Sequence, residues 1–174
     1  TQVIRHKYRN QLLATPPSKE IRVLMIGNNP RELGCLSMHL RNFAWKRFLV
    51  NATFDLSEGW KIARYYNPDY ILIDGSLSPG SIRIFVDQLR NFKATSKAVV
   101  AMLKESNHSE LVIPGVQDYL LSDNIASDTF AFDVLNAIAH QKQEESKQVF
   151  EAAVNRTSGS WFSQLFGKKV MVNS

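Results

Sequence analysis

Short apolar runs alternate with amphipathic segments along most of this chain, and the two patterns predict different elements. A short apolar run that ends in turn-forming residues is typical of a strand buried on both faces of a sheet. Apolar residues spaced three and four apart are typical of a helix packed on a core. The predicted strands are Ile21–Ile26, Phe48–Phe54, Tyr70–Ile73, Ala98–Leu103 and Gln117–Leu121.

Helices are predicted between these strands, with recognisable start and stop signals. Pro30 suits the first position of one helix, and Asp55 or Ser57 can cap another that ends at Asn67. The alternation predicts an α/β fold in which a parallel, doubly wound five-stranded sheet is covered on both sides. The predicted helices are Pro30 to about Phe43, the segment from the Asp55 or Ser57 cap to Asn67, Ser81–Phe92, a weak one at Glu110–Ile113, and a long one from about Ser127 through Phe150 and on to Val154.

The two ends of the chain differ from its centre. Residues 1–19 form a basic extension that ends at two prolines, and residues 20–141 form the domain. We expect residues 142–174 to contain the extended helix and a linker. After Thr157–Ser160, the amphipathic stretch Trp161–Val172 could touch a membrane surface or lead into a further output region, and we favour the second.

Composition places the chain among water-soluble globular proteins. Of its 174 residues, 44% are hydrophobic and 21% charged, and no apolar run approaches the roughly 20 residues of a membrane span. The polar, basic start has no apolar signal segment, so we expect a cytoplasmic protein. The single cysteine, Cys35, excludes an internal disulfide, and we expect it to be buried on a helix.

The net charge of +5 and the pI near 9.4 raise the question of an anionic partner. Arg41–Arg47 interleaves basic and aromatic residues, as a surface for single-stranded nucleic acid would. We favour the alternative that Phe43 and Trp45 close the core where a helix passes into a strand. Because no recognition helix or zinc module is visible, nucleic acid is disfavoured as a partner.

Candidate site residues follow the predicted strands. In an open α/β sheet, ligands gather at the carboxyl ends of the strands, near the point where strand order reverses. Four separate segments should therefore meet at one edge. They contribute Gly27, Asn28, Asn29, Asp74, Lys104 and Ser122.

Residues 21 to about 141 resemble the receiver domain of response regulators, the phosphoacceptor module of two-component signalling in bacteria. The resemblance implies a flavodoxin-like (βα)5 fold with Asp74 in the phosphoacceptor position. It extends over roughly 120 residues and leaves both ends of the chain unassigned. Four pieces carry it: Val23–Pro30, Asn67–Asp74 with Pro79-Gly80, Ala98–Leu103, and Gly115–Leu120.

This sequence departs from the family at the positions that assist the aspartate. Gly27 and Asn28, with Asn29 next, stand where the family has two acidic residues that hold Mg²⁺. Lys104 replaces the family's threonine or serine, and Ser122 replaces its lysine. Tyr119 keeps the position of the aromatic switch residue, although an ordinary core tyrosine would look the same.

The loss of the acids weakens the case for a metal. Mg²⁺ is usually anchored by one or two carboxylates together with phosphate, so Asp74 among neutral amides should bind it poorly. We therefore predict no metal and no cofactor. As a hypothesis, the Lys104 ammonium replaces metal and family lysine as the counter-charge of Asp74; the alternative is an exposed surface lysine.

These features favour a pseudo-receiver, a non-enzymatic signalling module that binds a protein partner or an attached output domain without phosphorylation. By the resemblance, a homodimer would use roughly Glu110–Ile113, Tyr119–Leu121 and Asp128–His140. The first alternative is an atypical receiver phosphorylated on Asp74. Others are a regulatory segment of a larger enzyme or ATPase, and a small anionic ligand on the main-chain donors of Gly27–Asn29.

Overall fold

The computed structural model describes residues 19–105, 112–122 and 129–166, with side chains described up to Val154. The chain divides into two compact units, one that runs to Val134 and one that begins at Leu135. Among the described residues, the first unit contains the sheet, helices α2 to α4 and the start of helix α5 (Phe130–Phe166). The described part of the second unit is the remainder of that helix.

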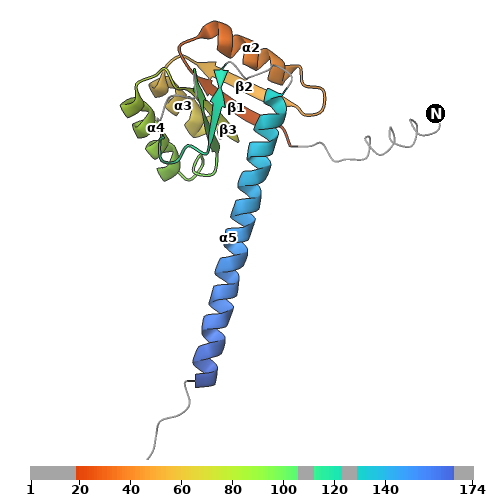
Figure 1. Cartoon of the computed structure of the whole chain (residues 1–174), viewed down its shortest axis with the longest axis vertical. Coiled ribbons are helices and arrows are strands. Elements are labelled where there is room, and N and C mark those ends of the chain that lie inside the picture. Colours follow the sequence, from red (N-terminus) through yellow and green to blue (C-terminus); the bar gives the residue numbers. More distant parts are fainter. Residues whose placement is uncertain (1–18, 106–111, 123–128, 167–174) are drawn as a thin grey trace, which may run out of the picture. The chain divides into compact units, whose positions relative to one another are not determined.

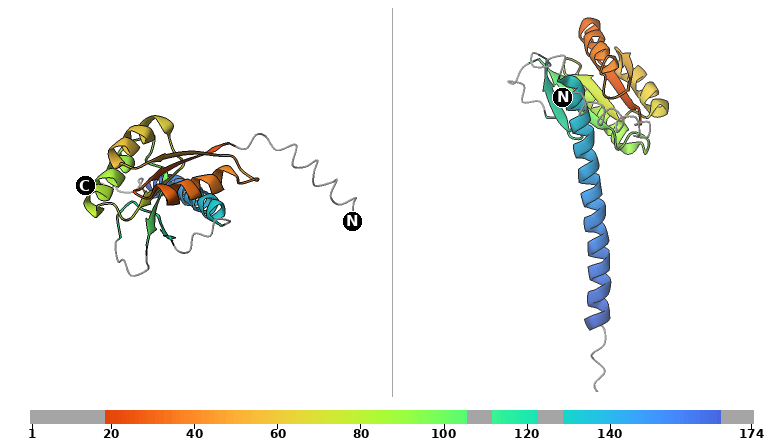
Figure 2. Two further views of the ribbon diagram at one scale, coloured as in Figure 1. Left: turned by 90° about the horizontal axis from the view of Figure 1, so that it is seen from above. Right: turned by 90° about the vertical axis from the view of Figure 1, so that its right-hand side faces the viewer.

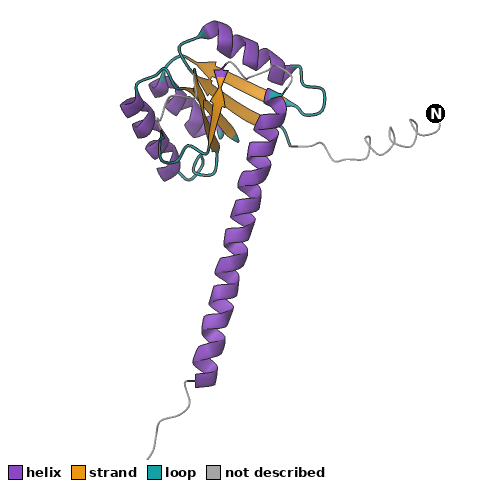
Figure 3. Ribbon diagram, viewed as in Figure 1, coloured by secondary structure: helices purple, strands orange, loops and turns teal. Residues whose placement is uncertain are grey.

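Five parallel strands form one sheet in the order β2-β1-β3-β4-β5, and helices occupy the connections between the first four of them (Figure 3). The order reverses between β1 and β3, as in a doubly wound fold. This confirms the predicted α/β class. The strands are β1 (Ile21–Ile26), β2 (Phe48–Thr53), β3 (Tyr70–Asp74), β4 (Val99–Lys104) and β5 (Asp118–Leu121).

Helices cover both faces of the sheet. Helices α3 (Leu56–Tyr66) and α4 (Pro79–Asn91) contact each other on one face, and α2 (Pro30–Arg41) lies on the other (Figures 1 and 2). Within the described ranges, no helix combines the length and the apolar character that a bilayer span requires.

The core has two layers because most positions of the central strands β1, β3 and β4 are apolar and buried. Leu24 and Ile26 of β1 belong to the cluster that α3 and α4 cover. Val23 and Met25 are also fully buried, and since successive side chains of a strand point to opposite faces, they fill the layer under α2. A strand buried on both faces is what the apolar runs predict.

The predicted start and stop residues Pro30, Asp55 and Asn67 are found at the helix ends, and the structure adds Asn29 as a cap that the sequence analysis did not name. Asn29 caps α2, with Pro30 in its first turn, and its side chain accepts a hydrogen bond from the main-chain N–H of Glu32. The Asp55 carboxylate accepts bonds from two N–H groups of the first turn of α3. Asn67 ends α3 in the left-handed conformation, at φ 50°.

Two predictions about burial are wrong. Cys35 lies on α2 as expected but is exposed, because α2 buries Leu33, Leu36 and Leu40 and turns Cys35 away from that stripe. Trp45 is exposed too and does not close the core. Its partner in that interpretation, Phe43, is half-buried.

Helix boundaries also differ from the predictions near the carboxyl terminus. Of the weak helix at Glu110–Ile113, the first two residues lie outside the described residues, and the last two are not helical. Ser127, the predicted start of the long helix, also lies outside. Helix α5 continues through Thr157–Ser160 to Phe166, where the sequence suggested a break. That stretch has no proline, and one glycine costs a helix only about 1 kcal/mol.

Arg90, in the last turn of α4, forms hydrogen bonds with loops at the amino-terminal edge of the sheet. Its guanidinium donates hydrogen bonds to the carbonyls of Ser96 (2.9 Å) and Ala98 (2.8 Å), which precede β4. It also donates to the carbonyl of Gly115 (2.5 Å) and to the side-chain oxygen of Gln117 (2.6 Å), which precede β5. One side chain thereby joins a helix to the entry loops of two strands.

We expect Arg90→Ala to lower the free energy of unfolding by about 2–4 kcal/mol, because it leaves several partly buried acceptors without a donor. Urea denaturation followed by circular dichroism measures the change. Arg83→Ala, an exposed position of the same helix, is the matched control and should stay within about 0.5 kcal/mol of wild type. Equal stability of the two variants would show that the Arg90 bonds contribute nothing net.

Candidate functional site

Strand register brings the predicted site residues to one edge of the sheet. Asp74, the last residue of β3, lies opposite Leu103 of β4, and Lys104 lies opposite Leu121 of β5. Ser122 follows directly after β5. The loop after β1 lies beside the same edge, because β1 pairs with β3 at the point where strand order reverses.

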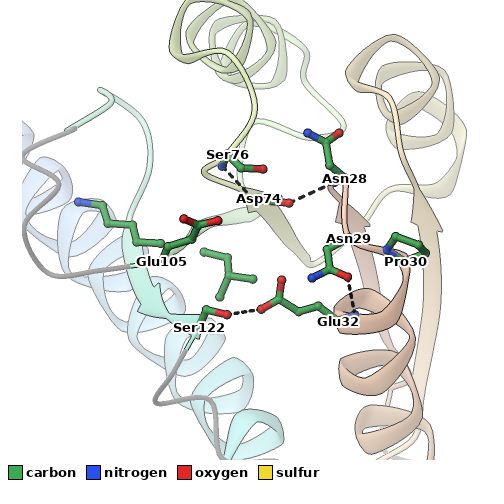
Figure 4. Close-up of a pocket in the computed structure, with 10 residues that line it drawn as sticks. Asn28, Asn29, Pro30, Glu32, Asp74, Ser76, Glu105 and Ser122 are labelled. Atoms are coloured by element: carbon green, nitrogen blue, oxygen red, sulfur yellow. Dashed lines mark hydrogen bonds between the residues drawn. The ribbon is translucent and has the colours of Figure 1, made fainter.

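These strand ends surround a pocket with a volume of about 290 Å³ (Figure 4). Five of the seven predicted site residues line it, and the other two, Gly27 and Tyr119, contact residues of its lining. The structure thus brings the predicted set together. The lining consists of Asn28, Asn29, Pro30, Glu32, Asp74, Ser76, Leu103, Lys104, Glu105 and Ser122.

Asp74 is held by main-chain amides. The N–H of Asn28 donates to one carboxylate oxygen at 3.1 Å, and the N–H of Ser76 donates to the other at 2.9 Å (Figure 4). The residue is 8% exposed, so little of this carboxylate meets solvent. Two such hydrogen bonds, one to each oxygen, fix the orientation of the carboxylate.

Gly27 lets the Asp74 side chain occupy this position. A Cβ atom at Gly27 would lie 2.6 Å from the Cβ of Asp74 and 2.9 Å from one carboxylate oxygen. Cβ atoms of folded proteins do not approach other heavy atoms so closely, so any larger residue would displace Asp74. Gly27 stands where the resembling family has an acidic residue, and Asp74 fills the space that the first atom of such a side chain needs.

Lys104 contacts an aromatic ring. Its ammonium lies 4.4 Å from the centroid of the Tyr119 ring, a cation–π distance. Among the ion pairs that join described residues, none connects Lys104 to Asp74. The hypothesis that Lys104 is the counter-charge of Asp74 therefore finds no support in this geometry. The main-chain amides take that role.

The Tyr119 side chain is fixed at both ends. Its hydroxyl accepts a hydrogen bond from the main-chain N–H of Ile113 at 2.8 Å and lies 3.4 Å from the carbonyl oxygen of the same residue. Its ring carries the Lys104 ammonium on one face. Tyr119 packs against the buried cluster under α3 and α4, as a core residue does.

Two carboxylates of the pocket were missed by the sequence analysis. Glu32 of α2 accepts a hydrogen bond from the hydroxyl of Ser122, across the pocket from it (Figure 4). Glu105 follows Lys104 at the end of β4. The spacing of Asn29 and Glu32 carries a signal, because an acid three residues after an N-cap belongs at a helix start. Nothing in the sequence pairs Glu32 with a residue ninety positions later.

The residues do not fit the Mg²⁺ that a receiver uses. Gly27 and Asn28 replace its two acids, and the space at Gly27 is closed by Asp74. In the described part of the chain, no group of three or more His, Cys, Asp or Glu side chains is placed to hold a metal ion. Three carboxylates and one ammonium line the pocket, so its charge is net negative.

Comparison with known proteins gives structural matches only. No protein-family model matches the sequence, and the search of curated proteins finds no match.

A candidate response regulator from Chloroflexus aurantiacus aligns with a TM-score of 0.59 at 20% identity. A receiver domain of a sensor histidine kinase from Pseudomonas aeruginosa, with a magnesium ion in its active-site cleft, aligns with a TM-score of 0.58 at 16% identity. A response regulator from Thermotoga maritima aligns with a TM-score of 0.56 at 18% identity. Each alignment covers 70% of this chain and 99% of the other. This chain therefore has the flavodoxin-like fold of response-regulator receiver domains.

Proposed function

We propose that this chain is a pseudo-receiver, a signalling module that uses the receiver fold to bind a protein partner or an attached output domain and does not depend on phosphorylation. One observation carries the proposal. The Asp74 carboxylate is packed against Gly27, and each of its oxygens accepts a hydrogen bond from a main-chain N–H. This environment suits a fixed structural charge better than a nucleophile.

The chemistry of phosphoryl transfer supports the proposal. The transferred group carries negative charge, and enzymes and receivers neutralise it with a metal ion and basic side chains. Here the two metal-binding acids are absent from the sequence, and Glu32, Asp74 and Glu105 surround the approach. These carboxylates would repel the negative charge of a phosphodonor that entered the pocket and would not neutralise it.

The surroundings of Tyr119 support independence from phosphorylation. A receiver that switches needs an aromatic side chain that moves when the aspartate is modified. In this chain the Tyr119 hydroxyl is bonded to Ile113 and its ring is covered by Lys104. Ser122 and Glu32 are bonded to each other across the pocket. We infer that these contacts hold one conformation, which the partner recognises as it is.

A working phosphoacceptor of atypical type is the second candidate. It is favoured by the position of Asp74, which ends β3 and lines an open pocket with two further carboxylates. Carboxylate oxygens are the ligands that Mg²⁺ prefers. The two candidates differ in one measurable property, the formation of an acyl phosphate on Asp74.

We expect no phosphorylation of Asp74 when the protein is incubated with Mg²⁺ and acetyl phosphate. Intact-protein mass spectrometry checks this, with an Asp74→Asn variant as the matched control and a receiver domain that keeps both acids as the positive control. Wild type and Asp74→Asn should give the same unmodified mass. A phosphate adduct that forms on wild type and is lost in Asp74→Asn would refute the pseudo-receiver proposal.

The close approach of Gly27 to Asp74 gives a second prediction. We expect Gly27→Ala to lower the free energy of unfolding by about 1–3 kcal/mol, because the new methyl group must displace the Asp74 side chain from its amide donors. Thermal and urea unfolding measure this.

Gly34→Ala is the control for this substitution. Gly34 lies in the interior of α2 with no atom within 4 Å of a built Cβ, so alanine there should stabilise the protein by up to about 1 kcal/mol. If Gly27→Ala is as stable as wild type while Gly34→Ala behaves as expected, Asp74 is not held against Gly27.

A further inference from the structure

The loop between α2 and β2 exposes a tryptophan that the proposed function does not use. Trp45 has 81% of its surface exposed, the largest fraction among the exposed large hydrophobic side chains of the described residues. A tryptophan so exposed buries little apolar surface in this unit, so its ring is accessible to a partner outside it. The sequence analysis singled out the same segment for its mixture of aromatic and basic residues.

The base of the loop is firmly packed. The ring of Phe43 meets the ring of Phe48 edge-on, with centroids 5.9 Å apart, and the ring of Phe132 at 5.1 Å. Phe132 lies at the start of α5, within the first unit, and is itself 51% exposed. Figure 1 shows this loop beside the start of α5. The loop therefore carries Trp45 on a fixed base that has a second exposed ring next to it.

Basic residues flank Trp45 along the chain. Residues 40–54 contain three basic side chains, Arg41, Lys46 and Arg47, and no acidic one. The guanidinium of Arg41 donates to the carbonyl of Val50 at 2.9 Å, and Arg47 pairs with Glu20 at 3.0 Å while remaining well exposed. Both arginines are thus held at the loop, Arg47 in an exposed ion pair with Glu20. We call Arg41, Phe43, Trp45, Lys46, Arg47 and Phe132 the aromatic-basic patch.

We propose that the aromatic-basic patch docks this domain on anionic phospholipid surfaces. A tryptophan ring is apolar along its body and carries one polar N–H, so it is stable at the level of the lipid headgroups. The basic side chains around Trp45 face the negative headgroups, which attract each Lys or Arg near the surface. Binding of this kind is peripheral and weakens as salt rises.

The geometry favours a lipid surface over single-stranded nucleic acid. Such strands bind where several aromatic faces follow one another along a basic groove. In this patch the Phe43 ring is engaged by two other rings, and Trp45 is the most exposed ring, at 81% against 51% for Phe132. A bilayer needs only a projecting amphipathic ring with cations beside it.

Vesicle flotation of the full chain tests the proposal. Vesicles of phosphatidylcholine mixed with phosphatidylserine are compared with vesicles of phosphatidylcholine alone. We expect binding to the mixed vesicles only, a several-fold loss of that binding in Trp45→Ala and in Lys46→Glu, and release at high salt. Trp45 is so exposed that Trp45→Ala should unfold at the temperature of wild type, which separates binding from folding.

Phe54→Ala is the matched control. Phe54 is 58% exposed and follows the carboxyl end of β2, whereas Trp45 precedes its amino end. This variant should float as wild type does. Three results would overturn the proposal: no flotation of wild type, equal flotation of Trp45→Ala and wild type, or Trp45-dependent binding to a single-stranded oligonucleotide without binding to vesicles.

Discussion

The contact between the Asp74 side chain and the main chain of residues 27–28 is the constraint on which the site depends. In a parallel sheet the ends of adjacent strands lie about 5 Å apart, so a side chain at the end of β3 must share its space with the loop after β1. In this chain the Asp74 side chain occupies that space. Gly27 contributes no side chain, and Asn28 contributes its N–H.

The other contacts of the pocket follow from this arrangement. With the carboxylate satisfied by amides, it does not require a basic side chain, and Lys104 lies instead on the Tyr119 ring. Ser122, in the place where the resembling family has a lysine, donates to Glu32 of α2. These contacts of Asp74, Lys104 and Ser122 together join β1, β3, β4, β5 and α2 at one edge. A pocket in which the protein's own groups satisfy one another is suited to holding a conformation.

The sequence predicted the fold well because its signals are local. Apolar runs, Pro30 at a helix start, Asp55 as a cap, and Asn67 as a stop each depend on a few neighbouring residues, and the structure has all of them. Strand ends then placed Asp74, Lys104 and Ser122 at one edge without any knowledge of side-chain direction.

The features that the sequence could not predict depend on the direction of side chains and on contacts between residues far apart in the chain. A lysine has four rotatable bonds, so the choice of Lys104 between Asp74 and Tyr119 is decided by tertiary packing. The bond between Ser122 and Glu32 joins residues that only the complete fold brings together. Trp45 was assigned to the core because it lies where a helix passes into a strand, although the loop can expose a tryptophan when Phe43 and Phe48 already pack against each other.

The most direct test of the central claim is a crystal structure of the protein soaked with Mg²⁺ and beryllium fluoride, a mimic of the phosphoryl group. The account predicts that neither binds at Asp74 and that its two oxygens still accept bonds from Asn28 and Ser76. Beryllium fluoride on an Asp74 oxygen, with Mg²⁺ beside it and the Asn28 bond broken, would contradict the account and identify a working phosphoacceptor.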